Sequence, residues 1–136
     1  MDWLTSNSMR MIEKSLDYTW RKQRIIAENI ANNETPGYKA KYITFEEAFQ
    51  RNLAAATGSL TSGNAAAGRK SRIQKAIGET GFTYHTSTAE TTRLDGNNVN
   101  TDVETAELAR TQLQYEYLVK QMSDQFTRLR IVIEGR

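Results

Sequence analysis

Cysteine is absent from this chain of 136 residues, and histidine and proline occur once each, as His85 and Pro36. Without cysteine there can be no disulfide framework, no thiol nucleophile and no cysteine-ligated metal site. One histidine is too few for a metal site built from several histidines, and it argues against a catalytic triad with a histidine base. We therefore expect a protein that is not an enzyme and that binds no metal and no cofactor.

A large excess of charge of either sign is also missing. The chain has 18 Lys and Arg residues against 16 Asp and Glu residues, which leaves a formal net charge of +2. This balance argues against a strongly basic nucleic-acid binder. Four cations lie close together (Arg69, Lys70, Arg72 and Lys75), but no aromatic residue is interleaved among them. We expect a solvated surface there instead of phosphate contacts.

Long hydrophobic runs are missing as well. The longest runs of strong hydrophobes have about three residues, as in Ile131, Val132 and Ile133, whereas a helix needs about 20 apolar residues to cross a bilayer. The first residues contain no basic stretch followed by an apolar core, so we expect neither direct membrane insertion nor an ordinary secretory signal. The 38% hydrophobic and 25% charged residues are compatible with one folded domain over residues 1–136.

Both ends of the chain contain a coiled-coil pattern, in which apolar residues recur at alternating steps of three and four. The pattern predicts one helix within residues 1–33 and a longer helix over residues 101–136. The candidate seam residues for packing and assembly are Met9, Ile12, Leu16, Ile26, Ile30, Leu108, Tyr115, Leu118, Met122, Phe126, Leu129 and Val132. Polar residues at the same spacing are Thr19, Gln23, Thr111 and Gln125.

The seam of the last helix is widened by a parallel row, Val119, Phe126 and Ile133, whose members are seven residues apart. A two-helix hairpin covers each apolar stripe on one side only, so we expect this row to stay partly exposed in a single chain. Neighbouring subunits are expected to complete the core. The last helix shows no evident stop before Arg136.

Residues 34–53 are expected to form a turn and a short helix. The first helix should end near Asn32 and Asn33, because asparagine tolerates the left-handed conformation that ends helices. Pro36 and Gly37 suit the centre of a type II turn. Capping boxes at Thr44–Glu47 and at Thr101–Glu104 predict where the short helix and the last helix begin.

Residues 54–100 are expected to form a variable linker and loop region. Thirteen of the 15 residues in 54–68 are Ala, Gly, Ser or Thr, which offers little apolar area for packing. The weak alternation of Phe82, Tyr84 and Thr86 is compatible with one or two minor strands, and His85 is expected to be an exposed loop residue. The expected fold is mainly α, a coiled-coil-like hairpin of two long terminal helices with a short helix and this flexible or minor-β middle.

The most specific string of the chain is Asn-Ile-Ala-Asn-Asn-Glu-Thr-Pro-Gly-Tyr-Lys at 29–39. It closely resembles the N-terminal signature of the bacterial flagellar axial proteins, the rod and hook family, in which Asn-Ile-Ala-Asn is followed by two variable residues and Thr-Pro-Gly-Tyr. The matching positions are Asn29, Ile30, Ala31, Asn32, Thr35, Pro36, Gly37 and Tyr38. The short length, the segment around Phe45 and the string at 94–100 resemble the proximal rod members. The resemblance is strong over 9–53 and 93–136 and weak over 54–92.

This resemblance implies a structural subunit of the flagellar basal-body rod, which transmits torque from motor to hook. It implies assembly with other copies, with other rod proteins and with the adaptor proteins of the membrane ring at the rod base. It also implies export by the flagellar type III apparatus without a cleaved signal, and a periplasmic location. The alternatives are a sister proximal rod protein and a coiled-coil secretion chaperone or adaptor. A small nucleotide-binding enzyme is a more distant alternative.

Overall fold

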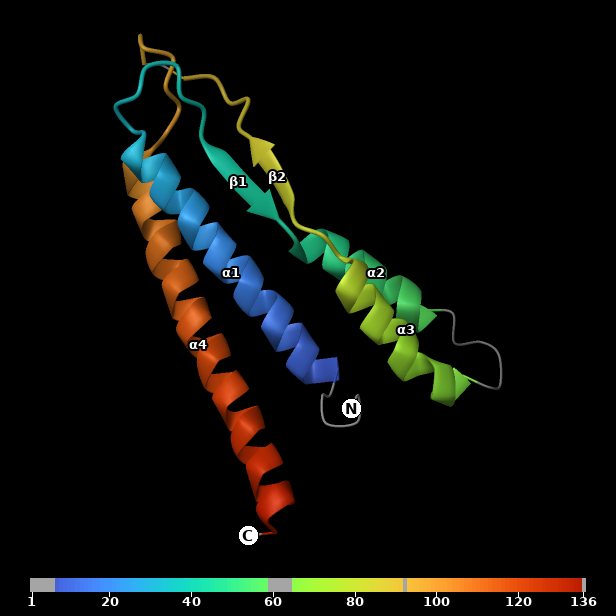
Figure 1. Cartoon of the computed structure of the whole chain (residues 1–136). Helices are drawn as coiled ribbons and strands as arrows, with labels where there is room; N and C mark the ends of the chain where they lie inside the picture. The colour runs from blue at the N-terminus through green and yellow to red at the C-terminus, as the bar shows by residue number, and fades with distance from the viewer. Residues whose placement is uncertain (1–6, 59–64, 92, 136) are drawn as a thin grey trace. The chain divides into compact units, whose positions relative to one another are not determined.

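The computed structural model describes residues 7–58, 65–91 and 93–135. In chain order its elements are α1 (Asn7–Ala31), β1 (Lys41–Thr44), α2 (Glu46–Gly58), α3 (Ala65–Glu79), β2 (Thr83–Thr86) and α4 (Thr101–Glu134) (Figure 1). The mainly α fold with two long terminal helices is confirmed. In the described part of the chain, no helix combines the length and the apolarity that crossing a membrane requires.

These elements belong to two compact units. The sheet unit consists of Asp17–Thr44 and Phe82–Tyr117, and the helical unit consists of Met1–Leu16, Phe45–Gly81 and Leu118–Arg136. Both long helices therefore contribute one part to each unit.

In the sheet unit, α1 and α4 run antiparallel. Lys22 Nζ lies 3.2 Å from Glu107 Oε2, and farther along α1 the Asn29 amide donates to Glu104 Oε1 at 3.1 Å. β1 pairs antiparallel with β2, with Tyr42 opposite His85. The apolar core of this unit is formed by Tyr18, Ile25, Ile26, Ile43 and Val99.

Two polar seam positions are buried in this core. Thr19 and Thr111 are both closed to solvent, and the Thr111 hydroxyl donates to the Glu107 carbonyl oxygen at 2.7 Å. A threonine that bonds its own helix in this way packs as a small apolar residue. The heptad pattern therefore holds at these positions although neither residue is a hydrophobe.

In the helical unit, α2 packs against α3, with Phe45 and Ile77 buried. The rings of Phe45 and Phe49 stack at 5.1 Å, and Asn52 donates to Thr80 Oγ1 at 2.9 Å. Leu16 of α1 and the C-terminal part of α4 line a groove of about 460 Å³.

The predicted linker at 54–68 is largely helical, which corrects the expectation from composition. α2 continues to Gly58 and α3 begins at Ala65, while residues 59–64 lie outside the described part. The physical reason is that alanine has the highest intrinsic helix propensity. Its small apolar area therefore says little about whether an alanine run forms a helix.

Both predicted capping boxes are wrong in detail. Thr44 is the last residue of β1, and α2 begins at Glu46. At α4 the cap is Asn100, whose Oδ1 accepts from the backbone N–H groups of Asp102 and Val103 at 3.1 and 3.3 Å. The Asn100 carbonyl also accepts the first helical bond, from Glu104 N at 2.9 Å, which is the geometry of an N-cap.

The end of α4 and the environment of His85 also differ from the expectation. Gly135 has φ +68° and donates to the Ile131 carbonyl oxygen at 2.9 Å, which is a left-handed glycine cap, so α4 does have a stop signal. His85 lies in β2, where its ring stacks on Tyr42 at 4.9 Å and bonds Thr44 Oγ1 at 2.9 Å. Cross-strand pairing half-buries this histidine.

Candidate functional site

The turn at 35–38 has the predicted geometry. Tyr38 N donates to the Thr35 carbonyl oxygen at 3.3 Å, and Gly37 has φ +72°. A positive φ at the third residue, with proline second, defines a type II turn. Gly37 N also donates to the Asp95 carbonyl oxygen at 2.7 Å, which ties the turn to the segment that precedes α4.

The sequence predicts that α1 ends in a left-handed asparagine, and this prediction is wrong. In the described residues only glycines have positive φ. Instead, the helix tightens: Asn32 N lies 3.2 Å from the Asn29 carbonyl oxygen and Asn33 N lies 3.2 Å from the Ile30 carbonyl oxygen. Just beyond the helix, Thr35 N donates to the Asn32 carbonyl oxygen at 3.1 Å. Carbonyl oxygens at a helix end can accept a second hydrogen bond from elsewhere in the chain.

Asn97 donates to the carbonyls at this end of α1. Its side chain is completely buried. The two N–H groups of Nδ2 are shared among the carbonyl oxygens of Asn32, Asn33 and Thr35, which lie 2.9, 3.0 and 2.9 Å from the nitrogen. Its Oδ1 accepts from Val99 N at 2.8 Å. The Asn97 side chain therefore binds the C-terminal end of α1, the first residue of the turn at 35–38 and its own backbone at Val99.

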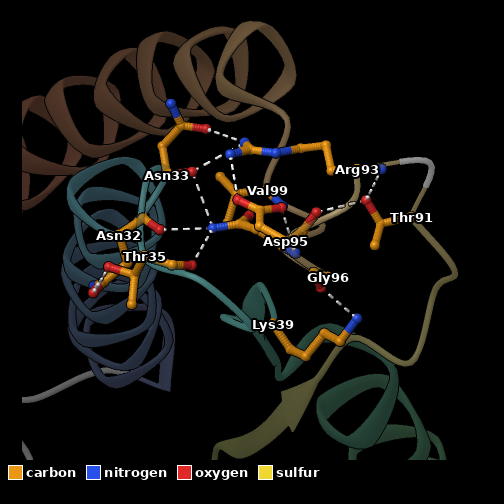
Figure 2. A network of polar contacts seen from close by, with 10 residues as sticks. Asn32, Asn33, Thr35, Lys39, Thr91, Arg93, Asp95, Gly96 and Val99 are labelled. Carbon is orange, nitrogen blue, oxygen red and sulfur yellow. Dashed lines mark hydrogen bonds and ion pairs between the residues drawn. The ribbon is translucent and has the colours of Figure 1, made fainter.

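An ion pair between Arg93 and Asp95 lies next to this buried amide. Arg93 donates to the carbonyl and side-chain oxygens of Asn33 at 3.0 and 3.2 Å and to Asp95 Oδ2 at 2.8 Å. Figure 2 shows Asn32, Asn33 and Thr35 on one side of the network and Thr91, Arg93 and Asp95 on the other. The pKa of the Asp95 carboxyl is lowered, mainly by the hydrogen bond from Asn97 N and also by Arg93.

The chain between the turn and β1 is held by the same loop. Lys39 Nζ donates to the Gly96 carbonyl oxygen at 2.7 Å, and Ala40 N donates to Asn98 Oδ1 at 2.7 Å (Figure 2 includes Lys39 and Gly96). Asn98 N donates in return to the Tyr38 carbonyl oxygen at 3.3 Å. Residues 35–40 and 95–98 therefore form one hydrogen-bonded joint.

Asn29 is the second buried amide of the site. Its Oδ1 accepts from Lys41 N at 2.9 Å and from the Tyr38 hydroxyl at 3.3 Å. Its Nδ2 donates to the Lys41 carbonyl oxygen at 2.8 Å and to Glu104 Oε1 at 3.1 Å. Burial raises the pKa of the Glu104 carboxyl, and the bond from Asn29 partly opposes that rise. Asn29 thus links α1, β1 and α4 with all its hydrogen-bonding groups in use.

The site brings together the two strings that the sequence singled out. The motif at 29–38 and the string at 94–100 bind each other through the Asn97 side chain and through the backbone N–H groups of Gly37 and Asn98. Pro36 is exposed. Sequence reasoning did not identify Asn97, although its string was noted. Among the described residues, no three acidic or histidine side chains gather as a metal site would require. What the geometry provides is a rigid structural joint.

The candidate seam residues divide by burial. Ile26 is buried, and Phe126 and Val132 are exposed by 56% and 74%. The half-buried members are Met9, Ile12, Leu16, Ile30, Leu108, Tyr115, Leu118, Met122 and Leu129. The parallel row of Val119, Phe126 and Ile133 is exposed, in agreement with the incomplete core that the hairpin predicted.

Gly37 offers a test of the turn. A Cβ at this position would meet no atom within 4 Å, so a substitution is strained only by the backbone angle. We expect Gly37→Val to lower the free energy of unfolding by about 1–3 kcal/mol and Gly37→Asn by much less, because asparagine tolerates this region. Urea unfolding followed by circular dichroism measures both. Equal losses in the two variants would mean that side-chain bulk, and not φ, determines the cost.

Similar proteins are found along nearly the whole chain. No family model matches it. The chain is 29% identical over 132 residues to the flagellar basal body rod protein FlgB of Bacillus subtilis, with 97% of each chain covered. It is 29% identical over 135 residues to FlgB of Borrelia hermsii (93% of this chain, 96% of the relative) and 26% identical over 131 residues to FlgB of Salmonella typhimurium (94% of each). These similarities are consistent with the FlgB-like flagellar rod family.

Proposed function

We propose that this chain is a structural subunit of the flagellar basal-body rod, which assembles with other rod components into the drive shaft. The observation that carries the proposal is the similarity to flagellar basal body rod proteins, which extends over 97% of the chain for one relative and 93% or more for the others. It supports this function over a coiled-coil secretion chaperone and over an enzyme, and the shared name FlgB favours it over a sister rod protein.

The exposed apolar surface of α4 supports assembly. Its exposed large hydrophobes include Leu113, Tyr117, Val119, Phe126, Ile131, Val132 and Ile133. Val119, Phe126 and Ile133 are seven residues apart and therefore lie on one face of α4, and an exposed apolar row of this kind marks an interaction site. Contacts between unlike faces of successive copies would extend as a helix instead of closing into a dimer.

The joint of residues 35–40 and 95–98, together with the bond between Asn29 and Glu104, suits a part that transmits torque. Twisting stress on α1 and α4 acts where the chain leaves one helix and enters the other. There, Asn29 and Asn97 hold both helix ends by hydrogen bonds between residues far apart in sequence. A joint with its buried polar groups paired resists deformation, because each bond that breaks exposes an unsatisfied group.

The finer assignments extend this proposal. The partners are other copies of the chain, other rod proteins and the adaptor proteins of the membrane ring at the rod base. The chain reaches the periplasm through the flagellar type III export apparatus without a cleaved signal peptide. No nucleic acid is a partner.

Deleting the gene tests the proposed function. We expect cells that express other flagellar proteins, assemble no complete rod and do not swim, and we expect a tagged copy of the chain to restore motility and to co-purify with basal bodies. A chaperone would stay outside the purified basal bodies. Unimpaired swimming of the deletion strain, or a restoring copy that is absent from the basal bodies, would contradict the proposal.

A further inference from the structure

The two strands of the sheet have different outer edges. Ser87 N donates to the carbonyl oxygen of Ala40, which stands opposite it, at 2.7 Å. Antiparallel partners alternate between hydrogen-bonded and non-bonded pairs. Tyr42 and His85 therefore form the next bonded pair, and the backbone groups of Tyr84 and Thr86 on β2 point away from β1.

The outer edge of β1 is covered by side chains of α1. Asn29 bonds both the N–H and the carbonyl of Lys41, at 2.9 and 2.8 Å. The Tyr18 hydroxyl donates to the carbonyl oxygen of Ile43 at 3.4 Å. These side chains satisfy the backbone groups that a third strand would otherwise satisfy on that side.

The outer edge of β2 has no such cover. Within the described part of the chain, the outward backbone groups of Tyr84 and Thr86 make no hydrogen bond. Both residues are exposed, Tyr84 by 57%. Unpaired N–H and carbonyl groups on an exposed edge are a ready template for pairing with another chain.

A cationic groove lies beside this edge. It has a volume of about 470 Å³ and is lined by residues of α1, by Lys41 and by Tyr84, His85 and Thr86. Its cations are Arg21, Arg24 and Lys41, and its acid is Glu28. Lys41 pairs with Glu28 at 3.7 Å and Arg21 pairs with Asp17 at 2.9 Å. Arg24 has no ion-pair partner among the residues that the structure describes.

We propose that β2 accepts an extended acidic segment of another protein as a third strand. Backbone hydrogen bonds to Tyr84 and Thr86 provide the pairing, and carboxylates of the segment face Arg24 and Arg21, whose guanidinium already reaches the Tyr84 hydroxyl at 3.0 Å. A second copy presenting the same edge brings a groove of the same positive sign, which repels the first. The inference goes beyond the proposed function and does not rest on it, since peptide binding is measured on the free chain.

Amide exchange of the full-length, isotope-labelled protein tests the inference. The probe is a blocked eight-residue peptide that alternates valine and glutamate, at a free concentration about nine times its Kd. We expect the exchange of Tyr84 and Thr86 N–H groups to slow about tenfold. One control peptide carries lysine in place of glutamate. Two further control peptides carry N-methyl groups, one on every valine and the other on every glutamate. The lysine peptide and at least one methylated peptide should give no protection.

Two proline variants provide a matched control on the protein. The Thr86 N–H points outward, so Thr86→Pro should preserve the pairing with β1 and abolish peptide binding, whereas His85→Pro removes a bond of the sheet itself. Arg24→Gln should weaken binding of the glutamate peptide about two- to fivefold. Three results overturn the proposal: unchanged exchange of both N–H groups with the glutamate peptide, equal binding of the lysine peptide, or protection that rises with protein concentration alone.

Discussion

Replacing Asn97 by aspartate is expected to destabilise the sheet unit by about 3–5 kcal/mol at neutral pH, because it places an uncompensated charge in a buried site. The amide nitrogen donates to three carbonyl oxygens in a completely buried position. A carboxylate there would face those oxygens with no proton to donate. Urea unfolding followed by circular dichroism measures the loss.

The pH dependence of this variant distinguishes charge from shape. Burial against three carbonyls raises the pKa of the new carboxyl above its ordinary value of about 3.9. A group whose pKa is raised in the folded state loses stability as the pH rises through that range. We therefore expect the deficit of Asn97→Asp, relative to the natural chain, to be smallest near pH 4 and largest near pH 8.

Two other variants serve as controls for Asn97. Asn97→Ala removes one donor from each of these carbonyls, which keep Thr35 N, Arg93 and Tyr38 N as partners. We expect a loss of about 0.5–1.5 kcal/mol for each hydrogen bond removed, and this deficit relative to the natural chain should not vary with pH. Asn100→Ser keeps a capping side chain at α4 and should change stability by only a few tenths of a kcal/mol. An Asn97→Asp protein that is as stable as the natural chain at pH 7 would show that the amide is dispensable.

The residues of this joint explain which parts of the structure the sequence could predict. The turn at 35–38 depends on Pro36 and Gly37 alone, so local dihedral preferences were enough to predict it. The partner of the α1 terminus is Asn97, which lies 62 to 65 residues from the carbonyls that it binds. No local pattern predicts a contact over that separation, and the expectation of a left-handed asparagine failed for this reason.

The start of α4 shows a second limit. Asn100 and Thr101 are adjacent and both are good N-caps, so the string alone gives two registers. The register with Thr101 needs Glu104 to reach back to the cap, but the carboxylate of Glu104 binds Asn29 instead. The tertiary contact between Glu104 and Asn29 therefore favours Asn100 over Thr101 as the N-cap of α4.

Heptad spacing shows a third limit. The spacing predicts which residues share a stripe on α1 and α4. It does not tell which part of the stripe the chain covers by itself. Ile26 and Val132 occupy seam positions of the same kind, yet Ile26 is 5% exposed and Val132 is 74% exposed. Only the positions of the neighbouring elements distinguish a residue of the core from an exposed residue that is available for contact with another subunit.

This difference leads to the prediction with the largest effect on assembly. Val132→Asp is expected to leave the free energy of unfolding of the isolated chain within about 0.5 kcal/mol of the natural value, because an exposed site tolerates a polar residue. In cells it is expected to abolish rod assembly and swimming, since the same position would be buried against a neighbour and a carboxylate there is costly. Phe126→Asp should behave in the same way.

Two comparison variants make the experiment decisive. Ile26→Asp buries a charge in the core of the sheet unit, so it should unfold the isolated chain before assembly begins. Lys120→Asp changes an exposed residue of α4 that lies off the seam and its parallel row, and it should preserve both stability and swimming. Thermal unfolding of the purified chains and motility of the complemented deletion strain give the two readouts. If Val132→Asp and Phe126→Asp cells swim as well as Lys120→Asp cells, the exposed face of α4 is not an assembly surface, because a repeated contact would multiply the effect of each substitution along the whole rod.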